Sequence, residues 1–191
     1  MEFSSDEYIK IGEIAKPFWE RGVSQKPPQF VIFMGGVGSG KTTIRREKYA
    51  TGYVHFDFGE IYKTIKKEFE KNNPKLSSYT ALASDMILRE SLGAGKNIAI
   101  EIIGDNKALI DPLIDKMKKL GYELSLQFIS CDPVEAYKRH LKAVKEDKNY
   151  LSAYFTQEAT LSFFYQQLEL GEMPVSEQNN MDSAIIEKAV K

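Results

Sequence analysis

The chain has 191 residues and a formal net charge of −1, from 26 Lys and Arg against 27 Asp and Glu. This balance argues against a protein that binds nucleic acid over its whole surface, although a local basic patch is compatible with it. Hydrophobic residues make up 42% of the chain, which suffices for a buried core. No apolar run approaches the roughly 20 residues of a membrane-spanning helix, so we expect no membrane partner.

The cysteine content and the N-terminal residues indicate in which cellular compartment the protein works. Cys131 is the single cysteine, which excludes an intrachain disulfide and is typical of a reducing compartment. Residues 1–7 lack the basic start and the apolar stretch of a signal peptide. We therefore expect a cytoplasmic protein, while delivery into a host cell by a specialised secretion system stays open.

Hydrophobic periodicity predicts helices that alternate with strands. An amphipathic helix over 6–21 is followed by a linker over 25–28 and an apolar strand over 30–34. The next predicted elements are a helix over 43–50, a strand over 53–57, a helix over 60–71, a helix capped by Ser77 or Ser78 that ends near 92, and a strand over 97–103. The last predicted elements are a helix over 108–120, a strand over 123–130, a helix over 133–147, an aromatic-rich helix over 152–169 and a short helix over 183–190.

A glycine-rich run lies between the first strand and the helix that follows it. Residues 35–42 fit the phosphate-binding pattern G-x-x-x-x-G-K-[ST] without a gap. Glycines let the backbone wrap around a phosphate, while loop N–H groups and the helix N-terminus face the anion. We expect Lys41 to reach the β- and γ-phosphates and the Thr42 hydroxyl to bind Mg²⁺. The predicted nucleotide-binding residues are Gly36, Val37, Gly38, Ser39, Gly40, Lys41, Thr42 and Thr43.

These elements predict an α/β fold, a three-layer sandwich around a mainly parallel sheet, of the type found in P-loop nucleoside triphosphate hydrolases and kinases. The predicted parts are an N-terminal helix and linker (1–27), a P-loop kinase domain (28–171) and a polar C-terminal tail (172–191). The run Asn106-Lys107-Ala108-Leu109 lacks the Asp of the guanine-binding N-K-x-D motif, which argues against a GTPase. The length suits a small-molecule kinase better than a motor or a helicase.

The order of the pieces resembles the zeta toxin family of P-loop kinases, over about Pro28 to Leu170. The resemblance rests on Gly-Gly-x-Gly-Ser-Gly-Lys-Thr-Thr at 35–43, an acid after the second strand, a helix with Tyr79 before the third strand, the pair Ile100-Glu101 and the exit Cys131-Asp132-Pro133. It implies ATP- and Mg²⁺-dependent phosphorylation of the sugar 3′-hydroxyl of a UDP-sugar such as UDP-N-acetylglucosamine. It also implies, for some members, a protein inhibitor, which here would bind through the N-terminal helix.

The resemblance assigns roles to acids after the second and third strands. The family's catalytic Asp falls on Gly59 here, so either Asp57 or Glu60 is the candidate that orients the acceptor hydroxyl. Glu101 ends a buried strand, where a charged acid is costly unless it is paired or near a metal. A water-mediated contact with Mg²⁺ and a structural hydrogen bond to a neighbouring loop are both open for Glu101.

Other positions depart from the family pattern. Asp105 and Leu82 stand where the family carries arginines that hold the substrate. The helix after the fourth strand offers Arg139 and Lys145 as the cation that closes over the transferring phosphoryl group. Arg45 and Arg46 follow the phosphate loop directly, and either a contact of one of them with the nucleotide or a surface position for both is open. We expect ATP, Mg²⁺ and a small-molecule acceptor as ligands.

Two alternatives come from other functional classes. The departures at the acceptor side are compatible with a nucleotide-binding interaction module that turns over little or no ATP. A nucleotide or polynucleotide kinase should show a clustered basic groove. The lysines that hint at one are Lys63, Lys66, Lys67 and Lys71, and their spacing suits a solvated helix face equally well, so we expect no nucleic-acid partner.

Overall fold

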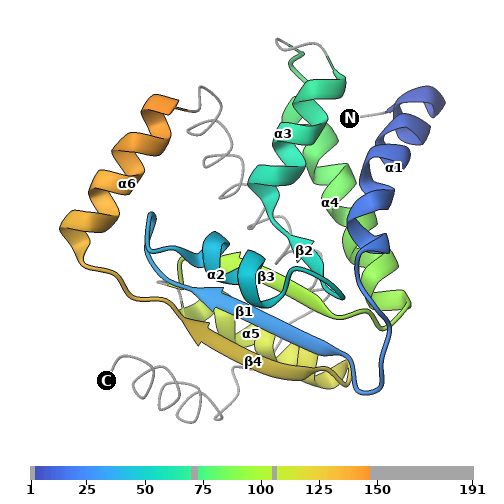
Figure 1. Ribbon diagram of the computed structural model, residues 1–191. Helices are drawn as coiled ribbons and strands as arrows, with labels where there is room; N and C mark the ends of the chain where they lie inside the picture. Colours follow the sequence, from blue (N-terminus) through green and yellow to red (C-terminus); the bar gives the residue numbers. More distant parts are fainter. Residues whose placement is uncertain (1–2, 70–72, 105–106, 147–191) are drawn as a thin grey trace.

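The computed structural model describes residues 3–69, 73–104 and 107–146. Its four strands are β1 (Gln29–Met34), β2 (Val54–Phe56), β3 (Ile98–Ile102) and β4 (Glu123–Phe128). They form one sheet in the order β2-β3-β1-β4, and every neighbouring pair is parallel (Figure 1). Because all four strands run the same way, their carboxyl ends meet at one edge of the sheet, where open α/β sheets place their ligands.

In the described residues, six helices connect and cover the strands. They are α1 (Ser5–Glu20), α2 (Lys41–Lys48), α3 (Phe58–Glu68), α4 (Leu76–Gly93), α5 (Lys107–Lys119) and α6 (Pro133–Glu146). The predicted order of elements is therefore confirmed through the end of α6. None of the helices in the described part of the chain is both long and apolar enough to cross a membrane. The helices predicted over 152–169 and 183–190, and the tail over 172–191, lie outside the described residues.

The predicted cap of α4 is wrong. Lys75 is the residue that precedes its first turn, and the Lys75 side chain makes no capping hydrogen bond. Ser77 and Ser78 lie inside the first turn instead. Hydroxyl residues are good caps where the chain enters a helix from extended backbone, whereas here Pro74 and Lys75 already form a turn before Leu76.

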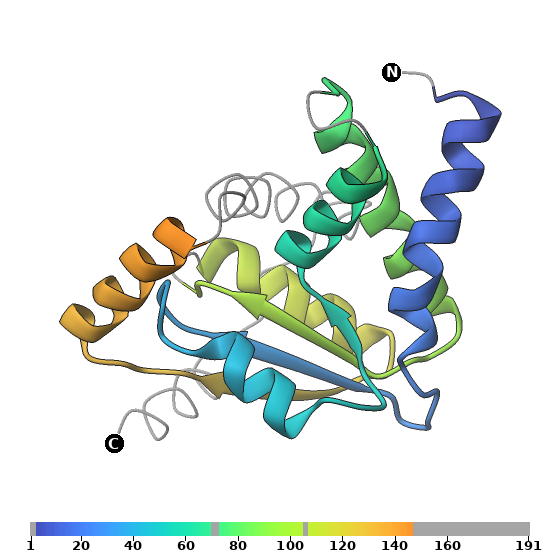
Figure 2. The ribbon, with the colours of Figure 1, turned by 45° about the horizontal axis from the view of Figure 1, so that its top comes forward.

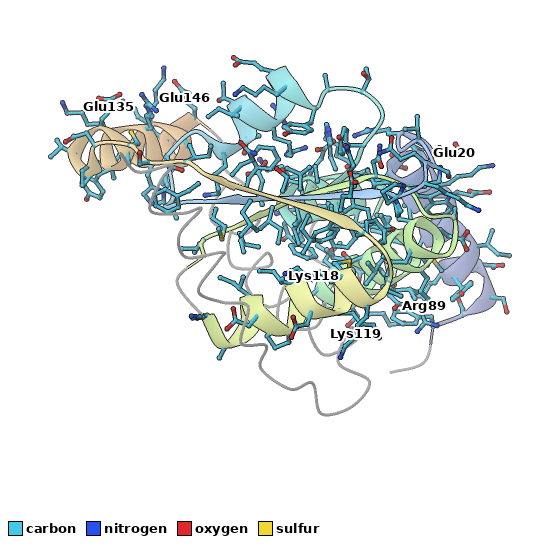
Figure 3. The ribbon with its side chains drawn as sticks, turned by 90° about the horizontal axis from the view of Figure 1, so that it is seen from below. Glu20, Arg89, Lys118, Lys119, Glu135 and Glu146 are labelled. Carbon is cyan, nitrogen blue, oxygen red and sulfur yellow. The ribbon has the colours of Figure 1, made fainter. Side chains whose placement is uncertain are left out.

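The central strand buries side chains on both faces. On one face of β1, Phe30, Ile32 and Met34 join the main core, while Val31 and Phe33 belong to a smaller core on the other face. Successive side chains of a strand point to opposite faces, so helices must cover both sides of this sheet. Figure 3 shows α2 and α5 on opposite sides of the strands. The three-layer sandwich predicted from the sequence is confirmed.

Helices α1, α3 and α4 pack against one another beside β2 and β3 (Figure 1). α1 contributes Ile11, Ala15 and Phe18 to the main core. A capping box begins this helix, because Ser4 accepts from the backbone N–H of Glu7 and the Glu7 carboxylate accepts from the backbone N–H of Ser4. The N-terminal helix is thus an integral part of the folded domain.

The Glu7 carboxylate also ties α1 to α4. It accepts a short hydrogen bond from the Tyr79 hydroxyl and lies 3.0 Å from Lys75 Nζ. The hydrogen bond from Tyr79, that from the Ser4 backbone and that from Lys75 lower the Glu7 pKa from 4.5 to about 2. The residues joined by Glu7 are 68 and 72 positions away in the sequence, so this contact fixes the tertiary packing of α1.

Glu7→Gln should therefore lower stability in a pH-dependent way. A carboxyl group whose pKa is depressed in the folded state stabilises the fold above its unfolded pKa, and this contribution is lost as the pH falls toward the folded pKa. We expect the wild type to melt above Glu7→Gln at pH 7, and the gap to shrink between about pH 4.5 and about pH 2. Thermal unfolding of both proteins across this range is the measurement. A gap that does not change with pH would contradict the role of the Glu7 charge.

Candidate functional site

The phosphate loop leaves β1 and enters α2 at Lys41. Gly38 and Gly40 have φ values of 75° and 104°, in the left-handed region that favours glycine. A Cβ at position 38 would lie 2.3 Å from the carbonyl oxygen of Ala136 on α6. The loop therefore needs glycine both for its turn and for its close approach to α6.

Polar groups converge inside this loop. The Lys41 ammonium donates to the carbonyl oxygens of Gly35 at 2.6 Å and Gly36 at 2.9 Å, so it curls over the loop. Burial lowers the Lys41 pKa, and the negative charges of Glu101 and Asp57 oppose that shift. The buried Ser39 hydroxyl oxygen has no hydrogen-bond partner among the residues that the structure describes. These donors fit a bound phosphate, which offers acceptors to each of them.

The first turn of α2 adds backbone donors to the loop. The N–H groups of a helix's first turn have no partner within the helix, and the helix dipole favours an anion there. Thr42 and Thr43 lie in this turn, with Thr42 partly buried and Thr43 exposed. Val37 is partly buried, and Gly36 is exposed with no other atom close to a Cβ built on it. The predicted nucleotide-binding residues thus form one continuous surface.

Thr42 and Glu101 meet at the ends of α2 and β3. The Thr42 hydroxyl donates to Glu101 Oε2 at 2.8 Å. Because this bond uses the hydroxyl proton, the oxygen lone pairs stay available to a metal. Hydroxyl and carboxylate oxygens are suitable Mg²⁺ ligands, and Mg²⁺ sites in such enzymes are completed by substrate phosphates and water. Among the described residues no cluster of three or more His, Cys, Asp or Glu that could hold a metal ion is present.

Arg45 is the unexpected member of the site. Its side chain is 0% exposed, so the surface position considered for it is wrong, whereas Arg46 is exposed. Arg45 Nε donates to Glu101 Oε1 at 2.5 Å, and Nη2 donates to Asp57 Oδ2 at 2.9 Å. One guanidinium therefore joins the acid that ends β3 to the acid that follows β2.

Asp57 and Glu60 take different positions. Asp57 is the N-cap of α3, and its Oδ1 accepts from the Glu60 backbone N–H at 3.0 Å. The Glu60 carboxylate lies 3.2 Å from Arg21, at the end of α1. The structure brings Asp57 together with Arg45 and Glu101, while the charge of Glu60 is paired with a different element.

The candidate lid cations lie on α6 (orange), on the other side of the molecule from α1 (dark blue) (Figure 2). A Cβ at Gly40 would lie 4.0 Å from Arg139 Nη1, so this guanidinium is next to the loop. Arg139 Nε also lies 3.1 Å from Glu135 one turn earlier. Lys145 is exposed near the end of α6. In Figure 3, Glu135 and Glu146 mark α6 at the other end of the molecule from Glu20 on α1.

A cavity of about 610 Å³ lies between the loop, the end of β4 and the first turns of α6. Its walls are mainly apolar. They are formed by Gly36, Val37, Ser39, Phe128, Ile129, Ser130, Cys131, Pro133, Ala136, Tyr137 and His140. A planar, largely apolar group attached to a phosphate in the loop would fit such a cavity.

Sequence reasoning missed the role of Arg45, but the sequence carries a signal for it. Arg45 is three residues after Thr42 on the same helix, and residues at that spacing share a helix face. The face that presents Thr42 to Glu101 therefore also presents Arg45. Leu82 and Asp105 stand at the two positions where the family carries substrate-binding arginines. Leu82 packs against the main core here, and Asp105 lies outside the described residues.

Comparisons with known proteins agree with this fold. The zeta toxin family model matches residues 19–171. A chain from the solved structure of the PezAT chromosomal toxin–antitoxin system of the human pathogen Streptococcus pneumoniae matches with a TM-score of 0.59 and 16% identity. The match covers 99% of this chain and 96% of that chain, and at this identity it shows a shared fold. A search of curated proteins finds no match.

Proposed function

The chain belongs to the zeta toxin family of P-loop kinase-like phosphotransferases, and we propose that it transfers the γ-phosphoryl group of ATP to a hydroxyl of a small molecule, with Mg²⁺ as cofactor. The observation that carries this proposal is the connected set Thr42, Glu101, Arg45 and Asp57. This set joins the Thr42 and Glu101 oxygens, which are of the type that binds Mg²⁺, to a second carboxylate at the start of α3. An ATP-binding module would need only the loop.

In this proposal the loop amides and Lys41 hold the β- and γ-phosphates, and Thr42 and Glu101 hold Mg²⁺ directly or through water. The ion would neutralise charge on the transferring group when bound. Asp57 orients the acceptor hydroxyl and accepts its hydrogen bond. Catalysis then comes mainly from positioning and from charge stabilisation, because phosphoryl transfer asks for little covalent chemistry from the protein.

The α6 side of the loop is proposed to bind the rest of the nucleotide. The apolar cavity beside Val37 and Tyr137 is suited to the base. Arg139 is favoured over Lys145 as the lid cation, because Arg139 is next to Gly40 whereas Lys145 is exposed near the end of α6. Arg139 Nε donates to Glu135 Oε1 at 3.1 Å, so Glu135 holds the guanidinium from one edge. A UDP-sugar is the first acceptor class to test, on the strength of the family membership.

ADP formation from Mg·ATP, with a panel of UDP-sugars, nucleosides, nucleotides and short oligonucleotides, tests the proposal. We expect one acceptor class to stimulate turnover, and Lys41→Ala to reduce that turnover by about 100-fold or more, since a positioned cation is lost. Lys48→Ala is the matched control, because Lys48 is exposed at the end of the same helix. If ATP binds and no acceptor raises ADP above the Lys41→Ala level, the nucleotide-binding module replaces the kinase.

Asp57→Asn separates the two roles of Asp57. Asparagine caps a helix about as well as aspartate, so α3 should begin normally. The carboxylate charge is lost, and we expect kcat to fall by about 100-fold, within the range for a lost general base. Glu60→Gln should change kcat little, because Glu60 is paired with Arg21. Equal losses in both variants, measured with the acceptor found above, would contradict the choice of Asp57.

A protein inhibitor is the further part of the proposal, since the structural match comes from a toxin–antitoxin system. α1 exposes Tyr8 and Ile9, whose side chains are 54% and 59% exposed, and such apolar residues suit a partner surface. We expect native mass spectrometry of the protein from its own source to find a complex with a second, different chain. Replacement of Tyr8 and Ile9 by serine should weaken that complex. Recovery of the single chain alone would contradict the inhibitor.

A further inference from the structure

Arg45 carries a charged side chain that lies inside the protein rather than on its surface. It is the buried residue of α2, and its exposure is 0%. Arginine is almost never fully buried unless it is paired. Both partners of Arg45 are acids at the carboxyl edge of the sheet, so the pairing occurs within the candidate site.

The geometry of the pairing is specific to arginine. Nε contacts Glu101 on β3 and Nη2 contacts Asp57 at the N-cap of α3, so two edges of one planar group face acids from two different elements. A lysine ammonium is a point charge and lacks the rigid fork needed to hold both acids at fixed directions. The side-chain exposures are 7% for Glu101 and 17% for Asp57, so little solvent screens these contacts.

The same contacts limit the positions of the groups that would meet Mg²⁺ and the acceptor. Glu101 has one oxygen on Arg45 and the other on the Thr42 hydroxyl. Asp57 has one oxygen on Arg45 and the other on the first turn of α3. Neither carboxylate can rotate without breaking its bond to the guanidinium.

We propose that Arg45 is a positioning residue, which holds Glu101 for the metal and Asp57 for the acceptor hydroxyl through one guanidinium. This inference rests on the proposed function and names a residue that sets its geometry. Partners behind metal-binding groups typically influence metal affinity or activity by about 10- to 100-fold. If Arg45 had only a structural role, its replacement would lower the stability of the fold, and it would change the affinity for nucleotide equally with and without Mg²⁺.

Binding of a fluorescent ATP analogue in EDTA and in excess Mg²⁺ separates these roles. The variants are Arg45→Met, which keeps the length and removes the charge, and Arg45→Lys. Arg46→Met is the matched control, since Arg46 is the next residue and is exposed. In EDTA we expect Arg45→Met to bind within about 3-fold of the wild type, because the loop is intact. The gain in affinity on adding Mg²⁺ should fall by about 10-fold or more.

Arg45→Lys provides the test of the inference if Arg45→Met does not fold. It retains the positive charge, and we expect it to melt cooperatively and to show a Mg²⁺ gain between those of the wild type and Arg45→Met. Three results would overturn the inference. One is a Mg²⁺ gain at the wild-type level in Arg45→Met or, where that variant does not fold, in Arg45→Lys. Another is an equal loss of affinity with and without Mg²⁺. The third is a wild type that shows no Mg²⁺ gain.

The binding assay needs no acceptor, so it can contradict the role of Arg45 without contradicting the proposed function, and the reverse. If the wild type turns over no acceptor while Arg45 variants lose the Mg²⁺ gain, the kinase proposal fails and the metal-side role of Arg45 stands. If an acceptor is found, Arg45→Lys should lower kcat by about 10-fold or more with KM for ATP within about 3-fold. Unchanged kcat in that variant would remove the acceptor-side role.

Discussion

The buried charge of Arg45 is the constraint on which the arrangement of the site depends. A cation removed from water is costly unless opposite charges meet it with good geometry. Here those charges come from Glu101 and Asp57, so α2, β3 and the start of α3 must keep their relative positions. Removing one partner of such a buried pair costs about 3–5 kcal/mol in general, which gives the site a strong preference for one geometry.

The phosphate loop divides the carboxyl edge of the sheet into two sides. On one side the loop packs against α6, and Gly38 approaches Ala136 too closely for any side chain. On the other side α2 presents Thr42 and Arg45 to the acids of β3 and α3. The apolar cavity and the acidic groups are thereby kept apart, which is the separation that two different substrates of one transfer reaction need. Because the strands are parallel, the segments that follow their carboxyl ends all lie at one edge of the sheet.

The sequence was sufficient for the order of elements and for the loop, because apolar periodicity and a gapless glycine motif are local signals. It was not sufficient for Arg45, since a charged residue in a short helix resembles a solvent-facing one until the tertiary partners are known. The sequence also left Asp57 and Glu60 as two candidates, because their partners are visible only in the folded structure. They are three residues apart, yet the first turn of α3 directs one acid to Arg45 and the other to Arg21. The prediction of the α4 cap was wrong for a related reason, because the path of the chain into Leu76 decides where this helix starts.

In the proposed reaction, the Asp57 carboxylate would serve structure and chemistry together. Its Oδ1 caps α3 and its Oδ2 contacts Arg45, so both oxygens are engaged in the folded protein. Each carboxylate oxygen has two lone-pair sites, and each of these contacts uses one of them. A site therefore remains for an incoming hydroxyl, whose direction is set in advance by the two existing bonds. The cap gives α3 its starting point and at the same time removes the rotational freedom that an acid oriented toward a substrate would otherwise have to lose on binding.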